Sequence, residues 1–451
     1  MEDAVRLYRL ALTCFAGLGS DKGGRLVLSL FFKAVLGVQR IFHFDSLTDV
    51  GFAWLTGGSR ILCRNALGGL VRAAATRSVS RFIRLSRPPL ALARRLAVSI
   101  DEHAVARFTR KFLIAKGFHT IRNKHMRVEK LFFSFGIDGR VLLDLIVTKG
   151  SGRLARIASQ LLAPLRRRAR ARQLRTVLDA GAAQSHRELL KLVDENRRHV
   201  LLVRAPRRTA YIDRWKALPK NRFAPSEEPG RYNGAPAKRI HVAETKTRIR
   251  ADRHSPPRDV RTIVVREVAR TGKDRWHALF VFGDSATTPL TLIREFRARQ
   301  HHEQTYRIML HDAFVDAAPS GYNKQSPNPD RPGFRRNALG LYAWVTALAV
   351  NALNSFTLPL PKRYRLAHPR TLRRWWLNMQ ADLYLGKGTL FVVMRPRWFR
   401  GWWAKKIQRL NAKNIRVPWM DNRLVIYSLD TAPAGAEPPT DPATGAPGVG
   451  C

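Results

Sequence analysis

Acidic residues and cysteines are both scarce in this sequence. Lys and Arg number 81 against 33 for Asp and Glu, which gives a formal net charge of +48. A globular chain with this imbalance repels itself unless an anionic partner neutralises it. The three cysteines, Cys14, Cys63 and Cys451, include no CxxC pair. This spacing supports neither a zinc ribbon nor a disulfide framework, and it fits a reducing compartment.

Long uninterrupted hydrophobic runs are missing too. The most apolar stretch, NALGLYAWVTALAVNALNSF from Asn337, is long enough to cross a membrane. Alanine dominates it, however, and Asn351 and Asn354 interrupt it. We therefore expect a buried core helix there. The start of the chain, MEDAVRLYRLALTCFAGLG, lacks the basic start and apolar core of a signal peptide.

The sequence does contain enough apolar residues for a globular protein. Its 451 residues are 45% hydrophobic, sufficient for two or three domains with a sizeable core. The positive charge is spread along most of the chain. Nucleic acid is the leading partner, because phosphate contacts by Lys and Arg release counterions and dominate affinity. An anionic membrane surface is the competing partner.

Changes in composition and in hydrophobic spacing divide the chain into five predicted segments. Residues 1–93 are helical, either a packing domain or a DNA-binding module. Residues 94–206 and 290–430 form the two parts of an α/β core, and the second part also holds the C-terminal helices. Residues 207–289 form a β-rich insertion between them. Residues 431–451 are rich in Pro, Ala, Gly and Thr, and we expect them to be disordered.

Acidic residues end two strands of the predicted core. Its element order is β-β-β-α-β-α-β, with a hairpin turn at Asp138-Gly139. Asp101 ends the first strand in LAVSIDEH, and Asp179 ends the fourth in RTVLDAG. Strand ends in an α/β sheet are where sites are built. Ser185 and Glu188 predict a capping box at the start of the helix that follows Asp179.

A third carboxylate, Glu303, lies in the helical stretch REFRARQHHEQTYRIMLH. Residues at steps of three or four share one face of this helix: Phe296, Arg299, Glu303, Arg307 and Leu310. Glu303 has an arginine one turn before it and one turn after it. It is either a surface ion-pair partner or a carboxylate that turns toward Asp101 and Asp179.

Three carboxylates from separate elements can serve phosphodiester chemistry. Two divalent ions about 3.5–4 Å apart activate the attacking oxygen and stabilise the leaving one. Magnesium prefers oxygen ligands and keeps several waters, so a few carboxylates suffice. Acids at strand ends are also common in α/β proteins, where most are solvated or cap helices. Asp144, in VLLDLIV, competes with Asp179 as a ligand, and the sequence leaves this choice open.

From about residue 97 to 429 the chain resembles bacterial insertion-sequence transposases of the DDE type. LAVSIDEH matches the family's first aspartate at Asp101. TVLDAGAAQSHRELLKLVDENRRHVLLVRAPRR matches the block around its second aspartate at Asp179. In the family's motif Y-x2-R-x3-E-x6-K, Arg299 and Glu303 match.

The resemblance has two departures in that motif: the tyrosine is replaced by Phe296 and the lysine by Leu310. Otherwise it implies a ribonuclease-H-like mixed sheet with flanking helices and a β-rich insertion before the glutamate helix. It also implies that Asp101, Asp179 and Glu303 are catalytic and bind two Mg²⁺ ions, for which Mn²⁺ can substitute. The implied activity is endonucleolytic cleavage at transposon ends followed by strand transfer into target DNA.

The implied partners are the terminal inverted repeats and target DNA, with a homodimer assembled on DNA. No membrane is implied, and the location is cytoplasmic, at the bacterial nucleoid. We expect Arg299 and Arg307 to contact phosphates. Trp215 and Trp276 are candidates for stacking on a base flipped from the transposon end, with core packing as the alternative.

A different function stays open. The departures at Phe296 and Leu310 are compatible with a decayed element, a nucleic-acid-binding relative without catalysis. A basic membrane-associated protein is a third and weaker reading.

Overall fold

The computed structural model describes residues 1–90, 95–107, 115–119, 122–137, 141–169, 173–228, 238–268, 274–284, 286–317, 337–365 and 367–431. The chain divides into two compact units, one of residues 88–304 and one of residues 1–87 with 305–451. The predicted segment 290–430 is therefore split between the units. The predicted turn at Asp138-Gly139 and the tail from 432 lie outside the described residues.

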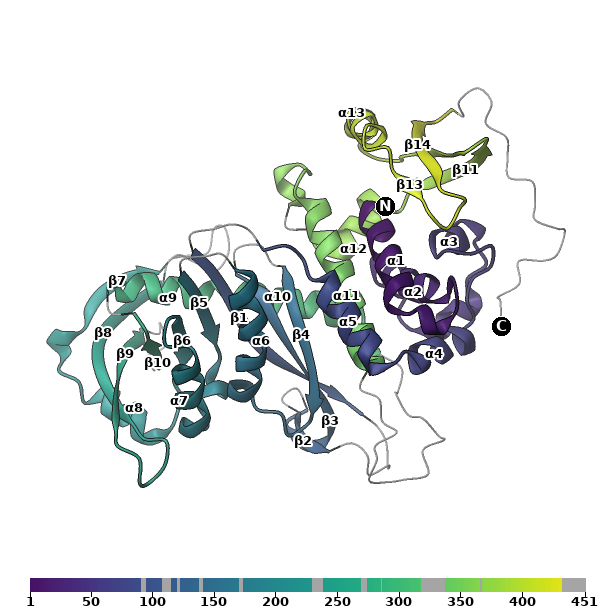
Figure 1. Cartoon of the computed structure of the whole chain (residues 1–451). Coiled ribbons are helices and arrows are strands. Elements are labelled where there is room, and N and C mark those ends of the chain that lie inside the picture. The colour runs from purple at the N-terminus through teal and green to yellow at the C-terminus, as the bar shows by residue number, and fades with distance from the viewer. Residues whose placement is uncertain are drawn as a thin grey trace, which may run out of the picture. The chain divides into compact units, whose positions relative to one another are not determined.

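The unit of residues 88–304 is built on a ten-stranded mixed sheet (Figure 1). The order is β2-β3-β1-β5-β6-β10-β9-β8-β7, and β4 also pairs with β3. The strands are β1 Arg95–Ala106, β2 Lys116–His119, β3 Lys124–Gly136, β4 Leu142–Lys149, β5 Gln173–Leu178, β6 Val200–Arg204, β7 Ala224–Glu228, β8 Lys238–Ile249, β9 Arg258–Glu267 and β10 Arg275–Phe282.

Three adjacent strands in this sheet, β1, β5 and β6, run parallel. Their outer neighbours, β3 and β10, are antiparallel to them. The strands predicted for the insertion, β8 to β10, continue the same sheet through β6. Residues 207–289 are thus not a separate β domain.

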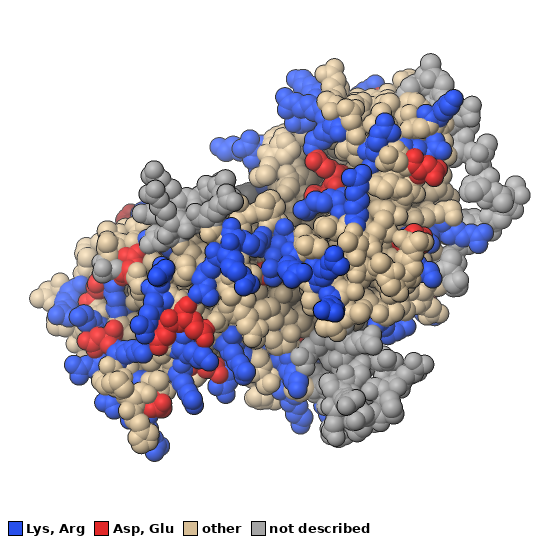
Figure 2. Space-filling view, viewed as in Figure 1, with Lys and Arg blue, Asp and Glu red and all other residues tan. Residues whose placement is uncertain are grey.

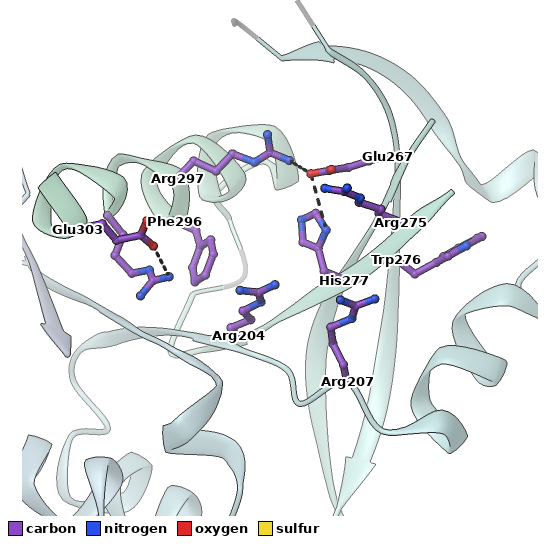
Figure 3. A pocket seen from close by; sticks show the side chains of 10 residues that line it. Arg204, Arg207, Glu267, Arg275, Trp276, His277, Phe296, Arg297 and Glu303 are labelled. Atoms are coloured by element: carbon purple, nitrogen blue, oxygen red, sulfur yellow. Dashed lines mark hydrogen bonds and ion pairs between the residues drawn. The ribbon is translucent and has the colours of Figure 1, made fainter. Parts of the chain in front are cut away.

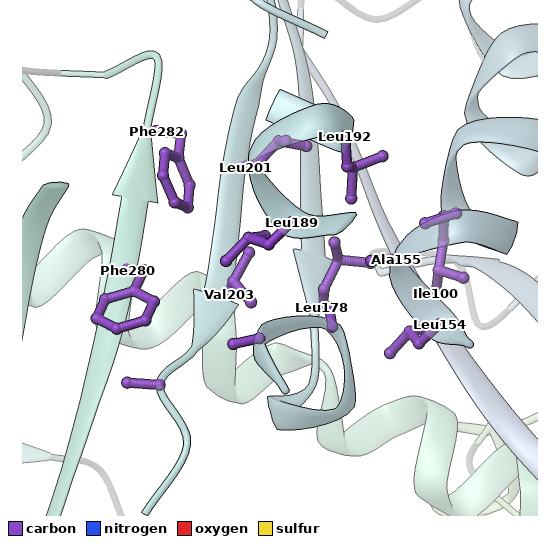
Figure 4. Close-up of a cluster of buried hydrophobic side chains, with 14 of the residues drawn as sticks. Ile100, Leu154, Ala155, Leu178, Leu189, Leu192, Leu201, Val203, Phe280 and Phe282 are labelled. Atoms are coloured by element: carbon purple, nitrogen blue, oxygen red, sulfur yellow. The ribbon is translucent and has the colours of Figure 1, made fainter. Parts of the chain in front are cut away.

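Alternation along the parallel strands gives the sheet two apolar faces. On one face, Ile100, Leu178 and Val203 pack with residues of α6 Leu154–Arg168, α7 His186–Glu195 and α8 Thr209–Lys216 (Figure 4). On the other face, Val177 and Leu202 pack with α9 Pro289–Ala298. Successive side chains of a strand point to opposite faces, so this pattern fixes which side each later residue takes.

The predicted capping box of α7 does not form. Ser185 is the N-cap residue, but its side chain makes no capping hydrogen bond. Glu188 instead accepts a hydrogen bond from Arg153 at 3.3 Å. The sequence spacing was right for a helix start, but a charged partner from α6's N-cap position competes for the glutamate.

The second unit combines helices with a four-stranded sheet, β11-β12-β14-β13. Its helices are α1 Glu2–Cys14, α2 Lys22–Leu36, α3 Val50–Leu55, α4 Arg64–Ala73, α5 Thr76–Ser86, α11 Asn337–Thr357, α12 Pro369–Leu372 and α13 Arg400–Asn411, and α10 Gln300–Arg307 enters it from the first unit. Its strands are β11 Gln380–Gly386, β12 Thr389–Arg395, β13 Arg416–Val417 and β14 Arg423–Leu429.

Helix α11 is the core helix of this unit. Residues 338–357 are long and apolar enough to span a membrane by length and composition, with a mean hydropathy of 1.2, yet 72% of that window is buried inside the protein. The indole of Trp344 donates a hydrogen bond to Ser86 Oγ at 2.8 Å. The prediction of a buried core helix is confirmed.

Lys33 of α2 is buried in the same core. Its side chain is 1% exposed, and its ammonium has no hydrogen-bond partner among the described residues. The ammonium lies 5.0 Å from the ring centre of Tyr342 and 5.9 Å from that of Phe314. Burial lowers the pKa of Lys33 to about 7, although the charge of Asp316 opposes this shift. A charged Lys33 therefore lowers the free energy of unfolding of the protein.

We predict that Lys33→Met stabilises the protein in a pH-dependent way. The unfolded lysine titrates near its ordinary 10.5 and the folded one near 7. The penalty is therefore full below pH 7, at up to about 5 kcal/mol, and vanishes above pH 10.5. The melting temperature should rise more at pH 6 than at pH 10. Lys22→Met, on the exposed start of α2, should show no such dependence, and an equal gain at both pH values would contradict the prediction.

Candidate active site: three carboxylates around Arg299

The parallel register brings two of the predicted acids side by side. The pairing of β1 with β5 ends at Ile100 opposite Leu178, so Asp101 and Asp179 are the next residues of the two strands. On β6, Val203 is opposite Leu178, so Arg204 continues the row. All three alternate toward the face covered by α9. The register of the parallel strands therefore determines that these three side chains lie next to one another.

Asp101 differs in one respect from the prediction. It does not end its strand, because β1 continues to Ala106 by pairing with β3. What ends at Ile100 is the pairing with β5. The carboxylate thus sits where one side of the strand has lost its neighbour, which opens room beside it.

A buried arginine fixes α9 over the sheet. Arg175 of β5 is 3% exposed, and its Nη1 donates to both carboxylate oxygens of Glu295 on α9 at 2.6 Å. Its Nη2 donates to Asp284 at 3.1 Å and to Thr287 at 2.8 Å. Burial raises the pKa of Asp284, but hydrogen bonds from Thr287 and Ala286 and the Arg175 charge outweigh it, so the pKa is lowered overall. The Asp284 carboxylate is therefore a charged partner of Arg175.

Helix α9 ends at Ala298, and the next residue, Arg299, places its guanidinium among all three predicted acids. Its Nη1 lies 3.3 Å from Asp101 Oδ2 and 3.5 Å from Asp179 Oδ2. Its Nη2 lies 3.4 Å from Glu303 Oε1. The side chain is 8% exposed and also lies over the ring of Phe296, with 5.4 Å from the guanidinium carbon to the ring centre. The structure thus brings the predicted acids together, with a cation between them.

The helical stretch that carries Glu303 is not one helix. Arg299 separates α9 from α10, and a π-helical turn, Ile308–Asp312, follows α10. Glu303 lies one turn after Arg299 and its side chain is 53% exposed. It therefore joins the carboxylate group from the solvent side. Arg307 belongs to the other unit, and its role as a phosphate contact stays a prediction.

Two other acids, Glu102 and the competing candidate Asp144, point away from this group. Glu102 follows Asp101 on β1 and therefore takes the opposite face, where it accepts hydrogen bonds from Lys130 at 3.0 and 3.2 Å. Asp144 pairs with Ser134, in the row of Ile100 and not in the row of Asp101. Asp144 therefore also turns to the opposite face. The geometry favours Asp179 over Asp144 as the neighbour of Asp101.

A basic pocket adjoins the carboxylates (Figure 3). Its volume is about 340 Å³. The lining residues are Arg204, Arg207, Glu267, Arg275, Trp276, His277, Phe296, Arg297, Arg299 and Glu303. Glu267 neutralises part of this charge by pairing with Arg297 at 2.9 Å. Burial lowers the pKa of Arg297 to about 10, so it stays charged at neutral pH.

Two pocket arginines, Arg207 and Arg275, are exposed and have no ion-pair partner among the described residues. Arg204 is paired only at long range, with its Nη1 at 3.9 Å from Asp179 Oδ1. The pocket is therefore a site where positive charge exceeds negative charge. The sequence alone predicted none of these three arginines as site residues.

The two candidate tryptophans have different surroundings. Trp215 is 2% exposed and stacks on Tyr211 in the core, with ring centres 6.1 Å apart. It is therefore unavailable to a flipped base, and that prediction is wrong for geometric reasons. Trp276 lies at the pocket, with the guanidinium carbon of Arg266 5.8 Å from its ring centre, and remains a candidate.

The carboxylate group suits a divalent metal by its chemistry. Its donors are oxygens of three carboxylates, and Asp179 Oδ1 is buried without a hydrogen-bond partner among the described residues. The spacing, however, is set by Arg299. Within the described residues, no three His, Cys, Asp or Glu side chains lie close enough together to hold a metal ion. Carboxylate oxygens are nevertheless the donors that Mg²⁺ prefers, and Mg²⁺ binding here stays a prediction.

Comparisons with known proteins add one distant likeness. No family model matches the sequence, and no curated protein matches it. Among solved structures, the chain is similar to piggyBac transposase in a cryo-EM structure of its synaptic complex with hairpin DNA. The TM-score is 0.43 at 12% identity, over 82% of this chain and 79% of that one. A likeness this distant carries no weight in the functional argument.

We predict that Arg175→Met destabilises the unit of residues 88–304. The substitution keeps the apolar bulk but leaves Asp284 and Glu295 without their cation. Removing one partner of a buried ion pair costs about 3–5 kcal/mol, equivalent to a fall in melting temperature of roughly 10 °C.

Arg258→Met is the matched control. It breaks a bidentate pair with Asp194, at 2.7 and 3.1 Å, whose side chains are 45% and 33% exposed. Because solvent screens this pair, the loss should stay below about 1 kcal/mol. Equal losses in the two variants would show that Arg175 does not anchor α9.

Proposed function

We propose that this protein is a DNA transposase with a ribonuclease-H-like catalytic core. Asp101, Asp179 and Glu303 are its catalytic carboxylates. The reaction class is hydrolysis of a phosphodiester at the transposon end, followed by strand transfer into target DNA. The observation that carries this proposal is the convergence of the three acids, from β1, from the end of β5 and from α10, on one guanidinium.

The arrangement supports nuclease chemistry better than a structural role. The structural cluster at Arg175 has contacts of 2.6 Å with Glu295 and 3.1 Å with Asp284. At Arg299, by contrast, three acids share one guanidinium at 3.3 to 3.5 Å. Glu303 is half exposed, so the group is open to a substrate. The face of the protein in Figure 2 carries Lys and Arg spread across it, as nucleic-acid binding requires. In a protein this basic, a group of three acids can bind a divalent cation next to the DNA phosphates.

We assign Asp101, Asp179 and Glu303 as the ligands of two Mg²⁺ ions, with Mn²⁺ able to substitute. Magnesium, when bound, supplies the charge that activates an attacking oxygen and stabilises a leaving one. In cleavage, the oxygen of water bonds to the phosphorus at the transposon end and the bond to the 3′ oxygen breaks. In strand transfer, the freed 3′-hydroxyl bonds to a target phosphorus and displaces the 3′ oxygen of the target strand.

The basic pocket positions the DNA in this proposal. Arg204, Arg207 and Arg275 bind phosphates next to the cleaved bond, because a planar guanidinium matches a phosphate bidentately. Trp276 offers an aromatic face for an unpaired base. Arg299 would also contact a phosphate once it leaves the carboxylates.

The remaining assignments follow from this activity. The DNA partners are the terminal inverted repeats and the target. Cutting two ends in one event calls for a homodimer on DNA. The location proposed is the cytoplasm of a bacterium, at the nucleoid, and the element is of the insertion-sequence type.

A catalytically inactive nucleic-acid-binding relative is the second candidate. Two observations favour it. The family's tyrosine and lysine are replaced by Phe296 and Leu310. In addition, Arg299 occupies the space among the carboxylates. This candidate binds the same DNA and cleaves none.

We predict that the protein cleaves labelled DNA from the flanks of its gene with Mg²⁺ and not with EDTA. Asp179→Asn should lower the cleavage rate by about two orders of magnitude or more, because several kcal/mol of metal-derived stabilisation are lost. DNA affinity should remain. Asp213→Asn, an exposed acid on α8, is the control and should cleave normally. Binding without cleavage by the wild type would favour the inactive relative.

We further predict that the double variant Arg207→Ala/Arg275→Ala weakens DNA binding. Each lost phosphate contact lowers the slope of log affinity against log salt by about 1. Arg156→Ala removes one exposed arginine from α6, on the other face of the sheet, and should leave the slope unchanged. Fluorescence anisotropy at several salt concentrations measures both. An unchanged slope in the double variant would mean that DNA does not enter the pocket.

A further inference from the structure

Arg299 contacts the three predicted acids at similar distances, and none of these three contacts is short. The distances to Asp101, Asp179 and Glu303 lie between 3.3 and 3.5 Å. Strong charge-assisted hydrogen bonds measure about 2.7–2.9 Å. The ion pair of Arg175 with Glu295 is much shorter, with 2.6 Å between the nitrogen and each carboxylate oxygen. The guanidinium of Arg299 is thus shared among the acids and docked on none of them.

The acids need such a cation when no metal is bound. Three like charges gathered within reach of one group repel one another, and each disfavours ionisation of the others. Arg204 is a second cation near the row and lies 3.9 Å from Asp179. Arg299 contacts all three acids and therefore compensates the charge of the whole group.

The position of Arg299 allows its guanidinium to move from the carboxylates to a phosphate in the basic pocket. The residue sits between α9 and α10, where neither helix constrains it fully. It also lines the basic pocket, so the same side chain borders both the acids and the proposed phosphate site. A phosphate bound there could accept two parallel hydrogen bonds from the guanidinium, which the three loose carboxylate contacts do not match.

We propose that Arg299 is the resident counter-ion of the carboxylate site and couples metal binding to DNA binding. In the DNA-free protein it competes with the divalent ion for Asp101, Asp179 and Glu303. A DNA phosphate draws the guanidinium into the pocket, and the acids then bind the ion more tightly. Because coupling between two ligands is reciprocal, the ion also strengthens DNA binding. This inference rests on the proposed function in taking the acids as a metal site and DNA as the ligand.

Mn²⁺ binding to the full-length protein tests the inference without any cleavage. Free Mn²⁺ is measured by electron paramagnetic resonance, with and without a duplex from the flank of the gene. In the absence of DNA, Arg299→Gln should bind Mn²⁺ more tightly, on the order of tenfold, because a competing charge is gone. Arg299→Lys, which keeps the charge, should bind weakly like the wild type. Adding Asp179→Asn to Arg299→Gln should abolish the gain and so locate it.

The duplex provides the second arm. It should tighten Mn²⁺ binding by the wild type on the order of tenfold and leave Arg299→Gln unchanged, since nothing remains to be drawn away. Arg258→Gln controls for loss of an arginine elsewhere on the unit and should behave like the wild type. The wild-type measurement keeps the inference open to disproof even if Arg299→Gln fails to fold, because a wild-type Mn²⁺ affinity that DNA does not alter overturns it.

Two results would overturn the inference: Mn²⁺ affinity that is unchanged or weaker in a folded Arg299→Gln, or a wild-type affinity that DNA does not alter. Cleavage separates this from the function proposed above. Normal cleavage with an unresponsive Mn²⁺ affinity removes only the counter-ion role. The expected Mn²⁺ pattern without cleavage supports the counter-ion role and removes the transposase.

Discussion

The buried ion pairs of Arg175 are the constraint on which the candidate site depends. This side chain joins β5, which ends just before Asp179, to α9, which ends just before Arg299. Its contact with Glu295 lies one helical turn before Arg299, so it sets where along the sheet α9 stops. The parallel register places Asp101 and Asp179 side by side, and Arg175 places the guanidinium and Glu303 above them. A desolvated ion pair adds little net stability, but it fixes the position of the two elements that it joins, here β5 and α9.

Much of the sheet unit could be predicted from the sequence. Apolar runs such as LLVR and IVVRE are short and bounded, and each became a strand. The acids that end strands were predicted as site residues because carboxyl ends of parallel strands share an edge. Asp101 and Asp179 meet for that reason. The prediction that Arg299 and Glu303 lie on the same side of the helical stretch also agrees with the structure, where the two side chains are in contact. Arg299 itself lies at the junction between α9 and α10.

Contacts between distant segments could not be predicted. Arg175 reads as an ordinary basic residue within a strand, and its partner Glu295 is 120 residues away. Nothing in the local sequence around Glu295 marks it as the partner of a strand residue. Trp215 looked like other tryptophans near arginines, and only its burial distinguishes it from Trp276. Likewise, no shift of composition marks residue 305, where the chain passes from one unit to the other, because that boundary falls within α10, the helix that holds Glu303.

The division of the chain has a consequence for its synthesis. Residues 88–304 are contiguous, whereas the other unit is assembled from the two ends of the chain. Domains fold as units while the chain emerges. Helices α2 and α5 therefore leave the ribosome long before α11, the helix whose Trp344 bonds to Ser86 and fills their core. Through that interval the faces that α11 later covers stay open to solvent, although α1 already packs on both helices.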